Sequence, residues 1–426
     1  MSERIATERP SYLPRMFSAL DNPSYRRFYI GQGISLVGAW IQAAAVSWIV
    51  FQDTNSELWL GIVAAASVLP GLLVGVFSGA LADRVVPRNM ILLMEIAQMI
   101  LAFTLAGLIG SGVADVRLLT LILALTRVCV AFEMPSRQVF MYQLVGREEL
   151  TNAIALNSGL FNASRVIGPA LAGILLARFD ETVCFFLNGL SYVAAIMAVL
   201  SIPRRVVVEA PAPRTEHRGV LGGFSYAWQD RRVGILFLAM TLFGIIGMGY
   251  DAMIPAFAKR VVHTDVGGYG VLLSSSGVGA TLGAFAVAWL GGFRRKEKLL
   301  VGGLLLFAGS LAAAAALPTL APMSWPRGAR VGLASICLFG IGFGAVVFYS
   351  AMQMLIQVSV PDHLRGRVMG IWMIAFSGSV PLGSLWTGKL ASSWGLPSTI
   401  GLSAVLCVFM AVGLAAWDHR TRHAHP

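Results

Sequence analysis

The sequence predicts an all-α integral membrane protein whose twelve transmembrane helices form two pseudo-symmetric six-helix bundles. Of its 426 residues, 57% are hydrophobic and only 12% are charged, which excludes a soluble globular domain. A membrane-spanning helix needs about 20 mainly apolar residues, and the chain holds twelve runs of that kind. A longer polar stretch near the middle of the sequence separates these runs into two groups of six.

The twelve apolar runs set the expected helices. They begin near residues 27, 57, 88, 118, 151, 182, 233, 267, 299, 331, 364 and 396. The first 25 residues are polar, contain Pro10 and Pro14, and lack the apolar core of a signal peptide. We therefore expect a retained amino-terminal tail over residues 1–25, bundles over 26–202 and 233–418, a linker over 203–232 and a tail over 419–426.

Weak internal repetition supports the division into two halves. Ser136 and Gln143 match Ser350 and Gln357 at a constant offset of 214 residues. Membrane proteins that are built from structural repeats show weak sequence symmetry of this kind.

The distribution of basic residues sets the expected orientation. Of the 32 Lys and Arg residues, 23 fall in the tails and loops of one side, 7 fall on the other side, and Arg127 and Arg165 fall within runs. Because cytoplasmic loops carry the excess of Lys and Arg, we expect both termini in the cytoplasm. The net charge of +11 is therefore a topology signal, and no nucleic-acid partner is expected.

The loop between the second and third runs combines charge with a tight turn. It reads Gly79-Ala80-Leu81-Ala82-Asp83-Arg84 and continues through Val86 and Pro87 to Arg88. Charge is costly in hydrocarbon, so this loop must lie at the water boundary. It resembles the signature loop between helices two and three of the major facilitator superfamily, although Val86 replaces the usual glycine and Pro87 replaces a basic residue.

The resemblance implies a conformational latch at this loop. In the superfamily, the acid at the position of Asp83 lies near the start of the eleventh helix, and a helix amino terminus stabilises a carboxylate. The expected latch residues, all on the cytoplasmic side, are Gly79, Asp83, Arg84, Arg88, Arg365 and Arg367. The alternative is that these charges only mark the membrane boundary.

The fifth run contains a second motif. Gly168-Pro169-Ala170-Leu171-Ala172-Gly173 resembles the Gly-Pro motif that exporters of the superfamily carry in this helix, with Ala172 in place of a glycine. Small residues let helices approach closely, and proline bends a helix where neighbours satisfy its backbone. The motif, with Gly168, Pro169 and Gly173 as its expected functional residues, favours export. The alternative is a kink that has no bearing on transport direction.

Two arginines lie within apolar runs. Arg127 matches the position of the superfamily's arginine motif in the fourth helix, often tied to proton coupling, although the glycines that usually follow are missing. Arg165 lies in the fifth run, and a rise of about 1.5 Å per residue places both arginines about 20 Å deep. Guanidinium groups at that depth need anions, from protein carboxylates or from a ligand. Both arginines are therefore candidates for a substrate cavity.

Three acids, Glu95, Glu133 and Asp251, lie clearly inside apolar runs. A competition between burial and a nearby arginine is what a proton-coupled site needs. The proton-coupling candidates are therefore Glu133, Asp251 and Arg127. Two alternatives stay open: Glu133 forms a structural ion pair with Arg137 one turn along, and Asp251 is a charge at the outer mouth.

Aromatic, amide and methionine side chains supply further cavity candidates. Adaptable apolar walls with a few polar groups suit bulky amphipathic ligands. The candidates, besides Arg127 and Arg165, are Trp40, Gln42, Tyr250, Phe348, Met352 and Gln353. Gln42 stands out because a buried amide needs hydrogen-bond partners, whereas such residue types more often serve as packing or interfacial anchors.

Glycine spacing has a simpler interpretation. Gly71, Gly75 and Gly79 in the second run, and Gly340, Gly342 and Gly344 in the tenth, predict close helix crossings. We assign these glycines no role in binding a substrate.

Several kinds of chemistry are excluded by motifs that are missing. The sequence has no nucleotide-binding loop of the Gly-x-x-x-x-Gly-Lys-Ser/Thr type, no metal-ligand cluster and no nucleophile elbow. The four cysteines, Cys129, Cys184, Cys337 and Cys407, lie in apolar runs without CxxC spacing. We therefore expect no cofactor, no metal and no enzyme activity.

Local stretches resemble one exporter branch of the superfamily, which holds bacterial siderophore (enterobactin-type), macrolide and multidrug exporters. They are Arg26-Arg27-Phe28 with Gly31-Gln32, Ala155-Leu156-Asn157 with Arg165, and Leu364-Arg365-Gly366-Arg367-Val368. The resemblance implies a monomeric, multi-pass protein of the bacterial inner membrane that exports an amphipathic organic molecule by alternating access and proton antiport. If Arg127 and Arg165 face the cavity, the substrate carries an anionic group.

Two other functions stay open at this point. A lipid or lysolipid transporter on the same fold is favoured if the cavity opens sideways to the bilayer lipid. A non-transporting membrane scaffold or sensor is a different class of protein. Charge kept inside the bundle argues against a scaffold, which has no need for that cost.

Overall fold

A computed structural model describes residues 17–82, 85–203, 230–290 and 296–423, without the side chains at 76, 77, 79–82, 362, 363, 366, 367 and 418–423. Every regular element among these residues is helical. The structure therefore confirms the predicted all-α fold class. The expected linker at 203–232 lies almost entirely outside the described residues, so the predicted domain bounds stay a prediction.

The amino-terminal half begins with a short 3-10 turn, η1. Its helices are η1 (Ser18–Asp21), α2 (Pro23–Thr54), α3 (Glu57–Ala66), α4 (Leu69–Ala82), α5 (Pro87–Gly110), α6 (Val116–Arg178) and α7 (Thr182–Leu200). Asn22 caps α2, because its side chain accepts hydrogen bonds from the backbone N–H groups of Ser24 and Tyr25.

The carboxy-terminal half starts with the same kind of cap. Asp230 accepts from the backbone N–H groups of Arg232 and Val233 at the start of α9. The first helical pass of this half is irregular: α9 (Arg231–Leu242) continues as η3 (Phe243–Gly247), η4 (Met248–Met253), α10 (Ile254–Ala256) and η5 (Phe257–Val262). The remaining helices are α11 (Val266–Trp289), α12 (Lys296–Ala315), α13 (Leu317–Leu320), α14 (Arg327–Ser359), α15 (Asp362–Trp394) and α16 (Leu396–His423).

The described helices make twelve membrane passes. Eleven helical runs are long and apolar enough to cross a membrane. One of them, α6, extends over 63 residues and contains Gly146 at a φ of +71°, where the chain leaves helical geometry. Glycine tolerates this left-handed conformation because it has no Cβ. Gly146 therefore divides α6 into two passes, and the predicted number of spans is confirmed.

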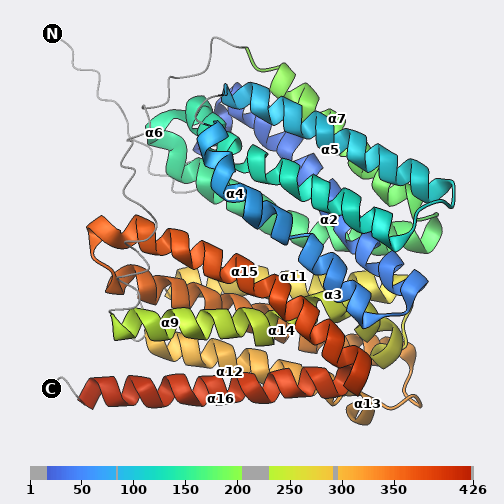
Figure 1. Ribbon diagram of the computed structural model, residues 1–426, viewed down its shortest axis with the longest axis vertical. Helices are drawn as coiled ribbons and strands as arrows, with labels where there is room; N and C mark the ends of the chain where they lie inside the picture. Colours follow the sequence, from blue (N-terminus) through green and yellow to red (C-terminus); the bar gives the residue numbers. More distant parts are fainter. Residues whose placement is uncertain (1–16, 83–84, 204–229, 291–295, 424–426) are drawn as a thin grey trace, which may run out of the picture.

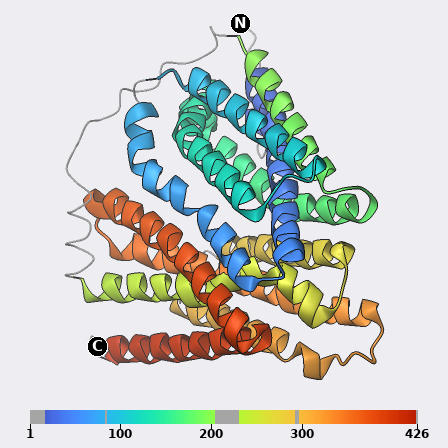
Figure 2. The same cartoon turned by 45° about the vertical axis from the view of Figure 1, so that its right-hand side comes forward.

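The helices form two groups. Figures 1 and 2 show α2 and α4–α7 on one side and α9, α12 and α14–α16 on the other, with the groups diverging toward the chain termini. We call that end the terminal end and the opposite end the far end. Toward the far end α3 packs on α15 and α6 packs on α11. A Cβ placed on Gly61 would lie 2.4 Å from the backbone oxygen of Ser384, so these two helices touch through their backbones.

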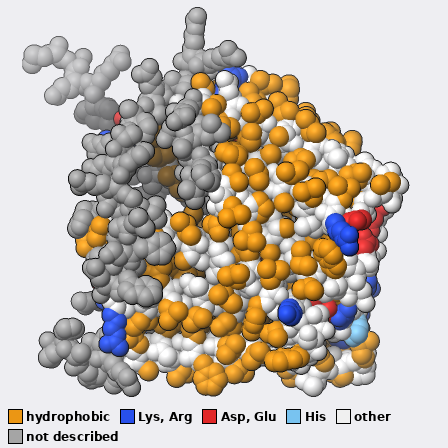
Figure 3. All heavy atoms as spheres, in the orientation of Figure 1, with side chains coloured by type: hydrophobic (Ala, Val, Ile, Leu, Met, Phe, Trp, Pro, Cys, Tyr) orange, Lys and Arg blue, Asp and Glu red, His pale blue; other side chains and the backbone are white. Residues whose placement is uncertain are grey.

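The outer surface fits a lipid environment. Large apolar side chains such as Leu73, Phe285 and Val412 are more than half exposed along the middle of the helices. Figure 3 shows hydrophobic side chains over most of the visible face and charged side chains near its two edges. An apolar band between charged ends is what a bilayer requires of a spanning protein.

Candidate functional site

A central cavity of about 270 Å³ lies between the two halves. Helices α2, α3, α6 and α7 form one wall, and η4 and α15 form the other. Its polar lining residues are Gln42, Ser47, Ser67, Thr126, Arg127, Asn188, Tyr192, Asp251 and Ser384. The remaining lining is made of Ala, Val, Leu and Met side chains, so the cavity combines an apolar wall with a few polar groups.

A second cavity, also of about 270 Å³, lies within the amino-terminal half. Ser35, Gln98, Glu133, Arg137 and other residues of α2, α5, α6 and α7 line it. Four residues line both cavities: Ala39, Arg127, Val130 and Tyr192. Arg127 therefore stands where the two cavities meet.

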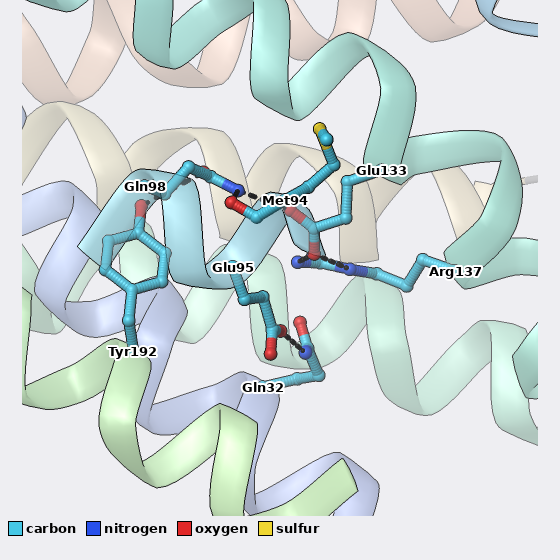
Figure 4. A network of polar contacts seen from close by, with 7 residues as sticks. All are labelled: Gln32, Met94, Glu95, Gln98, Glu133, Arg137 and Tyr192. Atoms are coloured by element: carbon cyan, nitrogen blue, oxygen red, sulfur yellow. Dashed lines mark hydrogen bonds and ion pairs between the residues drawn. The ribbon is translucent and has the colours of Figure 1, made fainter. Parts of the chain in front are cut away.

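A buried polar network joins the helices around this second cavity (Figure 4). Glu133 pairs with Arg137 on the next turn of α6, and Gln98 Nε2 on α5 donates to Glu133 Oε2 at 2.7 Å. The Tyr192 hydroxyl of α7 donates to Gln98 Oε1 at 3.1 Å. Glu133 is only 2% exposed, and its charge is neutralised by an arginine four residues along the same helix face. The pairing with Arg137 that the sequence left open is thus present.

Glu95 of α5 lies near this network and is bonded to α2 instead. Its side chain is fully buried, and Gln32 Nε2 donates to Glu95 Oε1 at 2.6 Å. Glu95 Oε2 and Gln32 Oε1 are buried without a hydrogen-bond partner. Sequence reasoning noted Glu95 as an intramembrane acid but did not choose it as a site residue. The available signal was the rarity of acids inside membrane spans.

Arg127 faces the cavities and is exposed to them. It makes no hydrogen bond or ion pair with any residue that the structure describes. Asp251, on the opposite wall, is likewise exposed to the central cavity. Arg165 does not line either cavity and lies close enough to Asp251 to interact with its charge. The structure thus places Arg127 and Asp251 on facing walls of the central cavity.

The remaining cavity candidates divide into two groups. Gln42 lines the central cavity and accepts a 2.8 Å hydrogen bond from Asn188 Nδ2. Trp40 instead packs edge-on against Phe161, with ring centroids 5.8 Å apart. Tyr250, Phe348 and Met352 are buried in the core of the carboxy-terminal half, and Gln353 is half-buried beside them on α14.

The exporter motif lies where α6 meets two other helices. A Cβ on Gly168 would lie 2.3 Å from Trp40 Cβ on α2, and a Cβ on Gly173 would lie 2.9 Å from Gly270 Cα on α11. Gly173 therefore lets the two halves touch near the far end. Pro169, between these glycines, is buried in α6.

The far end is held by polar contacts between the halves that the sequence did not suggest. Arg260 pairs with Glu57, which is 2% exposed, and Arg260 Nη2 donates to the backbone oxygen of Asn55 at 2.6 Å. Tyr269 of α11 stacks on Trp48 of α2, and its hydroxyl donates to the Ala44 carbonyl at 3.2 Å. These contacts could not be predicted from the sequence, because partners about 200 residues apart leave no local pattern.

At the terminal end, most expected latch residues lie outside the description. Asp83 and Arg84 are not among the described residues, and the side-chain surroundings of Gly79 and Arg367 are not described either. Arg88 donates to the backbone oxygens of Val199 and Leu200 at 3.1 Å, within its own half. Arg365 Nε donates to the Gln357 carbonyl at 3.1 Å. The latch stays a prediction.

A third hollow, an open groove of about 650 Å³, lies between α6, α11 and α14. Its walls are mainly apolar, and Ile174, Val271 and Ile336 are at least half exposed along it. It shares no lining residue with the two charged cavities.

Comparisons with known proteins cover nearly the whole chain. A family model described as transmembrane secretion effector (MFS_3) matches residues 15–424. The chain is 22% identical to the staphyloferrin A transporter of Staphylococcus aureus, over 90% of this chain and 94% of that protein. It is 25% identical to the multidrug efflux pump Tap of Mycolicibacterium fortuitum, over 87% and 88%. It is also 25% identical to the enterobactin exporter EntS of Citrobacter koseri, over 85% and 84%.

Solved structures share the fold. The nucleoside transporter NupG superposes with a TM-score of 0.74 at 12% sequence identity, over 92% of this chain and 98% of that one. At this identity the likeness concerns the arrangement of the helices.

Proposed function

Because this chain belongs to the transmembrane secretion effector family of the major facilitator superfamily, we propose that it exports an amphipathic small organic molecule by alternating access and proton antiport. It is a multi-pass membrane transporter and not an enzyme. We propose that it works as a monomer. The names of the relatives describe transporters of siderophores and drugs, so these are the substrate classes to test first.

One observation carries the proposal: charged side chains of both halves face one cavity whose far end is closed. Arg127 and Asp251 lie on facing walls, and the pair of Glu57 with Arg260 joins the halves beyond them. Alternating access needs a site between two bundles that touch at one end while they part at the other. The divergence of the helices toward the terminal end agrees with this arrangement (Figure 1).

The excess of basic residues on the terminal side assigns that side to the cytoplasm. With this orientation the cavity belongs to a state that loads substrate from the cytoplasm, as export requires. Latch residues around Asp83 would then hold the terminal end together in the opposite state.

The cavity lining supports an amphipathic substrate with an anionic group. Arg127 has no counter-ion among the described residues, so an anionic ligand group would neutralise it where the cavities meet. Gln42 and Asn188 add amide groups, and Leu60, Val63 and their neighbours add apolar surface. Glu133 and Asp251 are the acids that line the cavities, and with Arg127 they are our candidates for proton coupling.

Transport into proteoliposomes with an acidic lumen tests the proposal. Enterobactin, staphyloferrin A and the cationic dye ethidium serve as probes on protein whose terminal side faces outward. We expect at least one probe to accumulate, and a protonophore to abolish the accumulation. If none of the probes accumulates above the level of protein-free liposomes, the proposal fails for these substrate classes.

The groove between α6, α11 and α14 favours a second candidate, a lipid or lysolipid transporter. Its apolar walls face the bilayer, as an acyl chain would need. The groove is separate from the charged cavities, so this function leaves Arg127 and Glu133 without a role. Transfer of a fluorescent lysophospholipid between leaflets, independent of Arg127→Gln, would favour it over export of a soluble amphiphile. Against a scaffold or sensor, the charges inside the bundle remain the argument.

A further inference from the structure

Among the described acids of the amino-terminal half, Glu95 is the most enclosed. It has no exposed surface, and neither of the two cavities includes it in its lining. Its one hydrogen-bond donor is the Gln32 amide, a neutral group, at 2.6 Å. A buried ionised carboxylate without a cationic partner is costly by several kcal/mol.

The groups that face Glu95 leave it short of positive charge. Helix α2 supplies only the neutral Gln32, and α7 supplies Tyr192, whose hydroxyl is bonded to Gln98. Helix α6 supplies Arg137, which pairs with Glu133 and also interacts with the charge of Glu95. Arg127 and Cys129 are the other titratable groups on this part of α6, and neither bonds to Glu95. One arginine therefore serves two buried carboxylates.

Two oxygens without hydrogen-bond partners indicate that a proton is missing between Glu95 and Gln32. Glu95 Oε2 and Gln32 Oε1 are both buried without a hydrogen bond, in side chains that are at least 97% buried. Both atoms are acceptors when Glu95 is ionised, so they cannot satisfy each other. A proton on Glu95 Oε2 turns that atom into a donor. A rotation of the Gln32 amide then allows an acid–amide pair with two hydrogen bonds.

We propose that Glu95 stores a proton behind Glu133 and that the two acids share Arg137. In the state described, Glu95 is a neutral acid, and Glu133 is a carboxylate paired with Arg137 (Figure 4). When Arg137 turns to Glu95, the proton on Glu95 Oε2 passes to Glu133, and Glu133 becomes the neutral acid. The net charge of the three side chains is zero before and after the step.

The position of Glu133 gives the stored proton a route. Glu133, Gln98 and Arg137 line the second cavity, whereas Glu95 lies behind them. A proton on Glu133 can therefore pass to water in the cavity, and a proton on Glu95 cannot do so directly. The inference rests on the proposed proton antiport for its purpose, because storage gives the carrier a proton to exchange for substrate.

Infrared spectroscopy of the purified protein tests the storage site without transport. A protonated, buried carboxyl group gives a carbonyl band that is separate from those of carboxylates. We expect this band in the wild type at neutral pH, its loss in Glu95→Gln, and its displacement in Glu95→Asp. Glu148→Gln is the matched control, because Glu148 is an exposed acid of the same bundle, on the helix α6 that carries Glu133. Glu133→Gln should also remove the band, since it frees Arg137 to pair with Glu95.

The possible results separate this inference from the proposed function. A band that persists in Glu95→Gln, or no band in the wild type at any pH at which it stays folded, overturns the storage site. A band that Glu95→Gln removes, in a protein that shows no proton-driven export, leaves the storage site standing and overturns the antiport. If Glu95→Gln does not fold, the displaced band of Glu95→Asp decides the question.

Discussion

The two bundles share a topology but differ in what fills them. The amino-terminal bundle buries two ionisable groups close together: Glu95 with Gln32, and Glu133 with Gln98 and Arg137. Among the described residues, the carboxy-terminal bundle buries no acid, and clustered aromatic rings fill its core. Phe243 lies 5.0 Å from Phe307 and 4.5 Å from Phe348, measured between ring centroids, and Trp372 is fully buried nearby.

This difference indicates a division of labour. Proton chemistry needs acids with competing partners, and two of the three intramembrane acids, Glu95 and Glu133, lie in the amino-terminal bundle. The carboxy-terminal bundle contributes Asp251 to the central cavity and otherwise provides a tightly packed wall. Aromatic packing gives stability without titratable groups. Substitutions in the two bundles should therefore fail in different ways.

The largest effect is expected in the aromatic core. Phe348→Ala should destabilise the protein by about 4 kcal/mol, because it leaves a cavity at a fully buried ring. The protein that remains folded should keep the wild-type ratio of protons to probe. Thermal unfolding in detergent and flux in proteoliposomes measure the two effects. Phe285→Ala, at a ring that is 67% exposed to lipid, is the control and should change little. A changed ratio of protons to probe in Phe348→Ala would contradict the separation of proton coupling and packing between the two bundles.

A second prediction concerns the ionisable network. Glu133→Gln should lower stability by about 3 kcal/mol, because Arg137 loses its carboxylate on α6 and can pair again only if the buried Glu95 gives up its proton. It should also abolish proton-driven accumulation. Glu148→Gln should do neither. Unchanged accumulation in Glu133→Gln would remove Glu133 from the coupling mechanism.

The far-end closure should respond more weakly. Arg260→Met should cost the closed state about 2 kcal/mol, because it leaves the buried Glu57 carboxylate unpaired. The share of molecules with long distances between spin labels at Asp53 and His263 should be larger in Arg260→Met than in the wild type. Arg327→Met is the control, since Arg327 pairs with Asp265 inside one half. Equal distance distributions in both variants would contradict a role of the Glu57–Arg260 pair in closure.

The smallest effect is expected at the exposed pair of Arg327 with Asp265. The hydrogen bond from Arg327, together with the Gly268 N–H, holds the pKa of Asp265 below its usual range. A carboxylate whose pKa is lower in the folded than in the unfolded state stabilises the fold at pH values above its unfolded-state pKa. That stabilisation is lost as the pH falls through its folded-state pKa. Asp265→Asn keeps the helix cap and should cost about 0.5 kcal/mol at neutral pH. Thermal unfolding should show this difference vanish at low pH; a difference that grows on acidification would contradict the sign.

Local signals in the sequence were enough for the fold. The predicted starts at residues 57, 182 and 396 coincide with those of α3, α7 and α16, and the superfamily and exporter branch are confirmed by the comparisons. Hydropathy and short motifs depend only on neighbouring residues, so they can be read without knowing how the helices pack. The irregular turns from Phe243 to Val262 were not predicted, although Gly244, Gly249 and Pro255, residues that favour departures from a regular helix, lie within them.

Contacts between helices were the part that local patterns could not supply. The glycine prediction is confirmed in α14, where a Cβ on Gly342 would lie 2.1 Å from the Ser276 carbonyl. It is wrong for Gly75, where an added Cβ would meet no described atom within 4 Å, and Gly71 makes only ordinary contact at 3.4 Å. The pair of Gln32 with Glu95 depends on how α2 packs against α5. Small residues permit close packing, and the rest of the fold decides where it occurs.

Proton movement driven by a probe gradient tests the central claim most directly. Proteoliposomes are loaded with a probe that the wild type transports, diluted into probe-free buffer of equal pH, and followed with a pH dye in the lumen. Antiport predicts that the lumen acidifies as the probe leaves, and that Glu133→Gln abolishes the acidification. Probe efflux through the wild type without any change in lumen pH would contradict proton antiport.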